Sequence, residues 1–182
     1  IYRVEITLGI DTTTYDAEGE VVKTRNATNV TRDMVEESIQ PWIGVVQQTP
    51  PMYSAIKVDG ERLYKLARSG VEVKRESRPI EIHSITVIEF NTPTLILDIE
   101  CGRGTYIRSL AHDLGESLGC GGHVTDLVRL LCGGFTAEYG TTLGQLEEAA
   151  VSPEGWQKYL FPVDRVLRNL KSIFLSKNAE EN

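Results

Sequence analysis

The chain has 182 residues, a formal net charge of −7 and 41% hydrophobic residues. This length and composition allow a sizeable buried core and exclude disorder, collagen and coiled coil as the main state of the chain. No apolar run approaches the roughly 20 residues that span a bilayer, so we expect no membrane partner. The three cysteines are far apart and odd in number, which favours a reducing, cytoplasmic compartment, and their spacing predicts no metal site.

The first half of the chain predicts short strands and one helix. Residues 2–9 alternate apolar and polar side chains, as in a half-buried strand. A polar, turn-rich stretch over 11–19 precedes a short strand at 21–24. Thr31 is the predicted N-cap of a helix that runs to about Ile39, before Pro41.

The second half predicts a hairpin and further short elements. We expect a strand over 54–58, a helix over 61–69, and two hairpin strands at 80–90 and 95–101. A longer helix is expected to open at Gly104, with one apolar face, and to end at Gly119. Residues 125–131 are ambiguous, 142–150 predict a short helix, and 156–175 a packed tail. This mixture predicts an α+β fold.

Charge is distributed unevenly along the chain. The window 57–78 carries a net charge of +3, which leaves −10 on the remainder. A local basic element on an acidic body can hold a phosphate backbone, because phosphate contacts are local and release counterions. An ordinary solvated basic surface is the alternative.

One candidate for chemistry is the stretch 101–115, where a strand meets a glycine-bounded turn and a helix. Arg108 follows the apolar position Ile107 and therefore lies at the edge of the buried helix face. A partly buried guanidinium needs a carboxylate or phosphate partner. Tyr106 offers a flat face and a phenol nearby. A structural arginine that ties a strand to a helix is the equal alternative.

A second candidate is the stretch 48–68, in which aromatic and basic residues alternate. Tyr53 and Tyr64 are interleaved with four cations, which are Lys57, Arg62, Lys65 and Arg68. Aromatic rings stack on bases and cations hold phosphates, so this mixture suits RNA loops. The alternative is an amphipathic hairpin and helix with ordinary exposed cations.

Both stretches resemble the TruB family of tRNA pseudouridine synthases. Tyr2-Arg3 resembles the end of that family's Lys-x-Tyr-Arg motif, and residues 8–19 follow its Leu-Gly…Thr-Asp-Thr-x-Asp-x-x-Gly pattern. Residues 48–68 with Arg78-Pro79 resemble its thumb insertion, and 104–118 its arginine motif. The resemblance implies a catalytic core with a mixed or antiparallel sheet over 1–150 and a thumb at about 48–79. A tail without a complete PUA domain is expected over 151–182.

The resemblance also implies a reaction and its residues. A uridine of the tRNA T-loop, uridine 55, is flipped into a pocket and isomerised to pseudouridine by an aspartate nucleophile, without metal or cofactor. Arg108 matches the arginine that pairs with the nucleophile, and Tyr2 the tyrosine that stacks on the flipped base. Asp16 and Tyr106 match residues that bind the base or organise the site, and Leu127 matches an apolar wall. The cations of 57–78 would hold the T-arm.

The sequence departs from the family pattern at two points. The family's nucleophile lies in a Leu-Asp-x-x-Ala-x-Gly-type motif upstream of Tyr2, and this sequence contains no such motif. We therefore expect an N-terminally truncated synthase, inactive alone. A separate N-terminal fragment as partner and a non-catalytic RNA-binding relative are the alternatives. Thr13 stands where the family usually has aspartate, so one charge is lost there.

Outside the family, the sequence would fit an RNA-binding module without chemistry or a structural subunit of a ribonucleoprotein. The intact enzyme is expected to be monomeric, as family members usually work alone.

Overall fold

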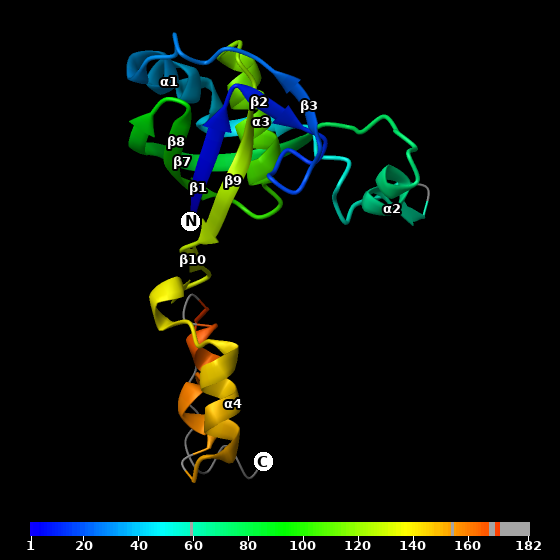
Figure 1. Ribbon diagram of the computed structural model, residues 1–182. Coiled ribbons are helices and arrows are strands. Elements are labelled where there is room, and N and C mark those ends of the chain that lie inside the picture. The colour runs from blue at the N-terminus through cyan, green and yellow to red at the C-terminus, as the bar shows by residue number, and fades with distance from the viewer. Residues whose placement is uncertain (59, 154, 168–169, 172–182) are drawn as a thin grey trace. The chain divides into compact units, whose positions relative to one another are not determined.

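A five-stranded antiparallel sheet organises the first part of the chain (Figure 1). The strands lie in the order β4 (Gly44–Gln48), β7 (Arg78–Asn91), β8 (Thr94–Cys101), β1 (Tyr2–Leu8) and β9 (Gly122–Arg129). This computed structural model describes residues 1–58, 60–153, 155–167 and 170–171. They fall into two compact units, Ile1–Leu130 and Leu131–Asn182. The predicted α+β class is confirmed.

One face of the sheet carries the core of the first unit. Val4 lies opposite Leu97, and Ile6 opposite Leu95, and all four side chains are fully buried. Helix α1 (Arg32–Ile39) contributes Val35 and Ile39 to the same core, and α3 (Ile107–Ser117) contributes the apolar face predicted for it. Burying that periodic face is what holds α3 against the sheet.

Smaller elements extend from this layer. β2 (Ile10–Thr12) and β3 (Val21–Thr24) form a ribbon beside the sheet. Between β4 and β7 the chain leaves the sheet, as Figure 1 shows, and forms the β5–β6 ribbon and helix α2. These elements are β5 (Lys57–Val58), β6 (Glu61–Arg62) and α2 (Leu63–Arg68). We call residues 49–77 the thumb segment.

Two expectations about local structure are wrong. The strand expected over 54–58 is limited to Lys57–Val58. The helix expected to open at Gly104 begins at Ile107 instead. The Gln48 side chain accepts a hydrogen bond from the Tyr106 backbone N–H at 2.8 Å and donates one to its C=O at 3.0 Å. These bonds hold Tyr106 in an extended conformation and so delay the first helical turn. The ambiguous stretch 125–131 contributes mainly to strand β9.

The second unit is described by itself. It contains β10 (Leu131–Cys132), β11 (Phe135–Thr136) and helix α4 (Leu143–Val151), with three 3₁₀ turns, η2 (Ala137–Tyr139), η3 (Trp156–Tyr159) and η4 (Val163–Arg165). Thr142 and Gln145 form a capping box, which confirms the helix expected there. The domain boundary expected near residue 150 stays a prediction, and much of the predicted tail lies outside the described residues.

Gly115 is the point at which α3 packs most closely on the loop that follows it. A Cβ at this position would lie 2.3 Å from the backbone of both Gly121 and Gly122. Because backbone atoms cannot move aside cheaply, we expect Gly115→Ala to lower the free energy of unfolding of the first unit by about 2 kcal/mol or more. Urea unfolding followed by circular dichroism measures this.

Gly144→Ala is the matched control, since Gly144 is also helical and a Cβ there would meet nothing within 4 Å. We expect it to stabilise α4 slightly, by about 0.5–1 kcal/mol. Equal tolerance of alanine at both positions would contradict the packing argument.

Candidate active site

The candidate site is centred on Arg108, in the first turn of α3. Its Nη1 donates to Asp16 Oδ2 at 2.7 Å and to the Thr14 carbonyl at 3.3 Å. Its Nη2 donates to the Tyr53 carbonyl at 2.8 Å. The Arg108 side chain is only 27% exposed and that of Asp16 21%. A charge removed this far from water needs such acceptors, so the functional and structural interpretations of Arg108 both predict this pairing.

The turn between β2 and β3 presents Asp16 in a fixed orientation. Thr14 Oγ1 donates to Asp16 Oδ1 at 2.5 Å, and the Glu18 N–H donates to the same oxygen at 3.1 Å. Thr12 Oγ1 donates to the Asp16 carbonyl at 2.7 Å. A parallel bridge between Asp16 and Val124 attaches the turn to the edge of β9. The carboxylate is therefore held by its own turn before it meets Arg108.

Gln48 connects the start of α3 to β4. It is 2% exposed, and its amide satisfies both backbone groups of Tyr106. One turn further along the chain, Ser109 Oγ donates to the Thr49 carbonyl at 3.0 Å. The base of the thumb segment is thus anchored to the same helix turn that carries Arg108. Sequence reasoning gave Gln48, Thr14 and the Tyr53 carbonyl no role, because the first two look like loop residues and a carbonyl leaves no side-chain signal.

Tyr2 and Leu127 lie together on the sheet. Tyr2 is opposite Arg129 and Leu127 is opposite Val4, so both are on the face that carries the core, in neighbouring strands. Tyr2 is half-buried, whereas Leu127 is 41% exposed. Among the described residues no hydrogen bond or ion pair links Tyr2 to Arg108 or Asp16. Their predicted roles remain predictions.

The four predicted cations of the thumb segment are exposed. Lys57 and Arg62 are paired across the β5–β6 ribbon. The Arg62 and Arg68 guanidinium carbons lie 5.9 and 5.7 Å from the centroid of the Tyr64 ring, so an aromatic face is flanked by charge as expected. The structure separates this patch from Arg108 in function, since only the base of the segment, at Tyr53, contacts the arginine.

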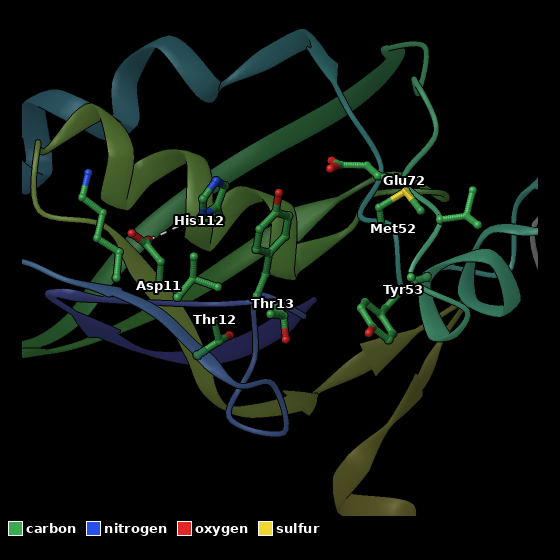
Figure 2. Close-up of a pocket in the computed structure, with 13 residues that line it drawn as sticks. Asp11, Thr12, Thr13, Met52, Tyr53, Glu72 and His112 are labelled. Carbon is green, nitrogen blue, oxygen red and sulfur yellow. Dashed lines mark ion pairs between the residues drawn. The ribbon is translucent and has the colours of Figure 1, made fainter.

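A cavity of about 490 Å³ lies between the β2–β3 ribbon and the thumb segment. Figure 2 shows Asp11, Thr12 and Thr13 on one side of it and Met52 and Tyr53 on the other. Neither Arg108 nor Asp16 lines the cavity. It therefore borders the candidate site without containing the charged pair.

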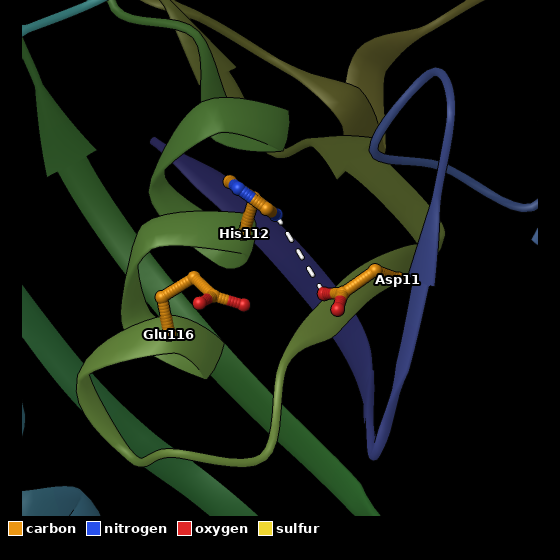
Figure 3. A group of neighbouring side chains, drawn as sticks. All are labelled: Asp11, His112 and Glu116. Atoms are coloured by element: carbon orange, nitrogen blue, oxygen red, sulfur yellow. Dashed lines mark ion pairs between the residues drawn. The ribbon is translucent and has the colours of Figure 1, made fainter. Parts of the chain in front are cut away.

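One group of side chains near this cavity has the composition of a metal site. Ligand atoms of Asp11, His112 and Glu116 lie within 4.8 Å of one another (Figure 3). The Arg25 guanidinium, however, already forms ion pairs with Asp11 and Glu116. Its hydrogen bond to Glu116 lowers the pKa of that carboxyl. The negative charge is thus balanced by the protein itself, and we assign no metal here.

Comparison with known proteins agrees with this geometry. Residues 1–107 match the model of the TruB family pseudouridylate synthase N-terminal domain, and residues 108–168 match that of the tRNA pseudouridylate synthase B C-terminal domain. The chain therefore belongs to the TruB family of pseudouridylate synthases.

Individual relatives give the same result. The chain is 43% identical over 173 residues to tRNA pseudouridine synthase B of Ruegeria sp. (strain TM1040), and 47% identical over 178 residues to that of Dehalococcoides mccartyi. These matches cover 94% and 98% of this chain but 57% and 59% of the relatives' length. The chain thus spans under three fifths of the curated relatives that it matches.

A solved structure shares the fold. The structure described as a Cbf5-Nop10-Gar1 complex superimposes with a TM-score of 0.67 at 24% identity, over 93% of this chain and 43% of that one. No helix within the described ranges has the length and apolar character needed to cross a bilayer.

Arg3, which follows Tyr2, forms a further ion pair on the opposite face of β1. Its Nε and Nη2 donate to the two carboxylate oxygens of Asp98, each at 2.8 Å. These bonds favour the ionised carboxyl and lower the pKa of Asp98. Because Asp98 is opposite Arg3 in the ladder, the pair also fixes the register of β1 on β8.

The lowered pKa predicts a pH dependence of stability. The unfolded carboxyl titrates near pH 4, above the folded one, so the pair stabilises the fold above that pH and stops doing so as the pH falls through the folded pKa. We expect Asp98→Asn to be less stable than the wild type at pH 7 and equally stable near pH 2. Urea unfolding at a series of pH values measures this.

Glu100→Gln, an exposed carboxyl on the same strand without such a partner among the described contacts, is the control. A stability difference between Asp98→Asn and wild type that is constant from acid to neutral pH would contradict the assignment.

Proposed function

We propose that this chain forms the RNA-binding and arginine-bearing part of a pseudouridine synthase that isomerises a T-loop uridine of tRNA, uridine 55. The observation that carries the proposal is Arg108, held by Asp16 and by two backbone carbonyls at the base of the thumb segment. The names of the relatives support tRNA as the substrate class. Family membership and the antiparallel core support the reaction class.

Arg108 retains capacity for a second carboxylate. A guanidinium has five N–H donors, and the described contacts use three of them. The remaining donors can hold a nucleophilic carboxylate in its ionised form and in position, which is the role proposed for Arg108. The reaction breaks the bond between N1 and C1′, forms one between C5 and C1′, and moves a proton from C5 to N1. It is an isomerisation and requires no redox cofactor.

Asp16 is poorly suited to be that nucleophile. Its Oδ1 accepts from Thr14 and from the Glu18 N–H, and its Oδ2 accepts from Arg108, so both oxygens are engaged. We propose that Asp16 organises the site and that the attacking aspartate lies in a segment outside these 182 residues. Such a segment could belong to the same polypeptide or be a separate fragment.

The remaining residues are proposed to receive the substrate. The half-buried Tyr2 ring would stack on the flipped uracil, and Leu127, on the same sheet face, would wall the pocket. Tyr106, fixed through its backbone by Gln48, would organise the opposite side. Lys57, Arg62, Lys65 and Arg68 would hold phosphates of the T-arm. The working form would be a cytoplasmic monomer.

Arg108 separates the enzyme from its alternative, an RNA-binding module without chemistry. With the chain joined to a family segment that carries the nucleophilic aspartate, we expect Arg108→Ala to slow single-turnover pseudouridine formation in a T-arm transcript by at least about 100-fold. Its Kd for the RNA should stay within about threefold. Arg108→Lys should also fail, because an ammonium cannot serve two carboxylates and two carbonyls in the same fork.

Arg103→Ala is the control, since Arg103 is exposed on the same loop and does not contact Asp16. The 182-residue chain alone should bind the transcript without forming product. Product from the chain alone would contradict the external nucleophile, and unchanged turnover in Arg108→Ala would contradict the proposed function itself.

The thumb segment is predicted to act through phosphate contacts. We expect the double variant Arg62→Ala, Lys65→Ala to bind the T-arm more weakly and with a shallower salt dependence, by about one unit of log Kd against log salt per lost contact. The rate at saturating RNA should not change. The matched control is Arg32→Ala, an exposed arginine paired with Glu36 on α1. Equal losses in both proteins would show that only overall charge matters.

A further inference from the structure

Helix α3 presents three polar side chains in a row, one turn apart. Arg108, His112 and Glu116 lie at spacings of four residues and therefore on one face. Arg108 binds Asp16 and the Thr14 carbonyl, and Glu116 binds Arg25, just after β3. Both outer members of the row thus hold the segment that runs through β2 and β3. The middle member, His112, is not used by the proposed reaction.

His112 contacts the same segment through a ring stack. The rings of Tyr15 and His112 are nearly parallel, at an interplanar angle of 8°, and their centroids are 4.0 Å apart. Tyr15 stands directly before Asp16 in the chain. The stack therefore acts on the residue next to the carboxylate that Arg108 binds.

Tyr15 adopts a backbone conformation that needs such support. Its φ is +64°, and it is the one non-glycine with positive φ within the described ranges. A bulky residue in the left-handed region costs roughly 1–2 kcal/mol, and such strain persists only where surrounding contacts determine it. Here the Tyr15 carbonyl also accepts a hydrogen bond from the Val124 N–H at 3.0 Å. The stack and this bond together hold the turn in its strained form.

The opposite side of the His112 ring is braced by charge. His112 Nδ1 lies 3.7 Å from Asp11 Oδ1, an oxygen that also accepts from the Gly122 N–H at 3.2 Å (Figure 3). Arg25 joins Asp11 to Glu116 on the same helix. Asp11 is 7% exposed, so this brace is buried and leaves the ring little freedom.

We propose that His112 is a positioning residue, which holds Tyr15 and thereby aims the Asp16 carboxylate at Arg108. The carboxylate is the shared end of two restraints, the pair with Arg108 and the turn fixed by the stack. Without the ring, the turn can relax out of the left-handed conformation and Asp16 moves with it. The expected effect on rate rests on the proposed function, whereas the effect on the Arg108–Asp16 pair does not.

Ring-retaining and ring-removing variants test this. In the nucleophile-supplemented protein, we expect His112→Ala to slow single-turnover pseudouridine formation about tenfold, with the Kd for the T-arm transcript unchanged. His112→Phe keeps a flat ring and should restore most of the rate. Tyr15→Asn removes the ring from the other side, on a residue that tolerates positive φ, and should match His112→Ala. The control is His83→Ala, an exposed histidine on β7.

A structural readout is independent of activity. In ¹⁵N spectra of the 182-residue chain, the three hydrogen bonds of Arg108 should slow rotation of its guanidinium and give separate Nη signals, assigned by their loss in Arg108→Lys. These signals should merge in His112→Ala and Tyr15→Asn and persist in His112→Phe and His83→Ala. Signals in folded Tyr15→Asn that match the wild type would overturn the proposal, as would His112→Phe as slow as His112→Ala. Absence of product in the wild type would overturn only the proposed function.

Discussion

The arrangement of the site depends on one constraint, which is that a largely buried guanidinium must be surrounded by acceptors. Arg108 finds them in the turn at 14–16, in the thumb segment at Tyr53 and in no nearer part of the described chain. Loss of one partner from such a charge costs several kcal/mol, so the turn, the thumb base and helix α3 are energetically linked. Arg108 thus brings together three segments that the sheet alone would leave apart.

The local elements of this arrangement were predictable, and the long-range pairings were not. The apolar spacing of 107–118 predicts a helix and places Arg108 at the edge of its buried face, as found. Which carboxylate meets that arginine depends on how β9 brings residue 16 beside α3, 92 positions away in sequence. Without the family resemblance no local pattern singles out Asp16. Gln48 escapes notice for a related reason, because it replaces backbone hydrogen bonds that a longer helix would have made itself.

The same reasoning explains the weak signal of β9. Only its first residues, including His123 and Val124, are buried, and the following ones are exposed on both faces. A strand that leaves the core partway along its length shows no sustained alternation, so periodicity leaves it undecided. The exposed end nevertheless matters, because Leu127 and Tyr2 lie there on one face. The part of the strand that contributes least to folding is the part available to a ligand.

The turn that carries Asp16 shows how a departure from the family pattern can be absorbed. Thr13, in place of the usual aspartate, accepts a hydrogen bond from the Glu20 N–H at 3.1 Å through its hydroxyl, so the turn keeps its cross-connection. What is lost is one negative charge about three residues from Asp16. Like charges so close would compete for the same guanidinium, and a hydroxyl does not. With threonine at this position, Asp16 is the single carboxylate of the turn's centre, and the ion pair with Arg108 is the only charge pairing that the turn can offer the arginine within the described residues.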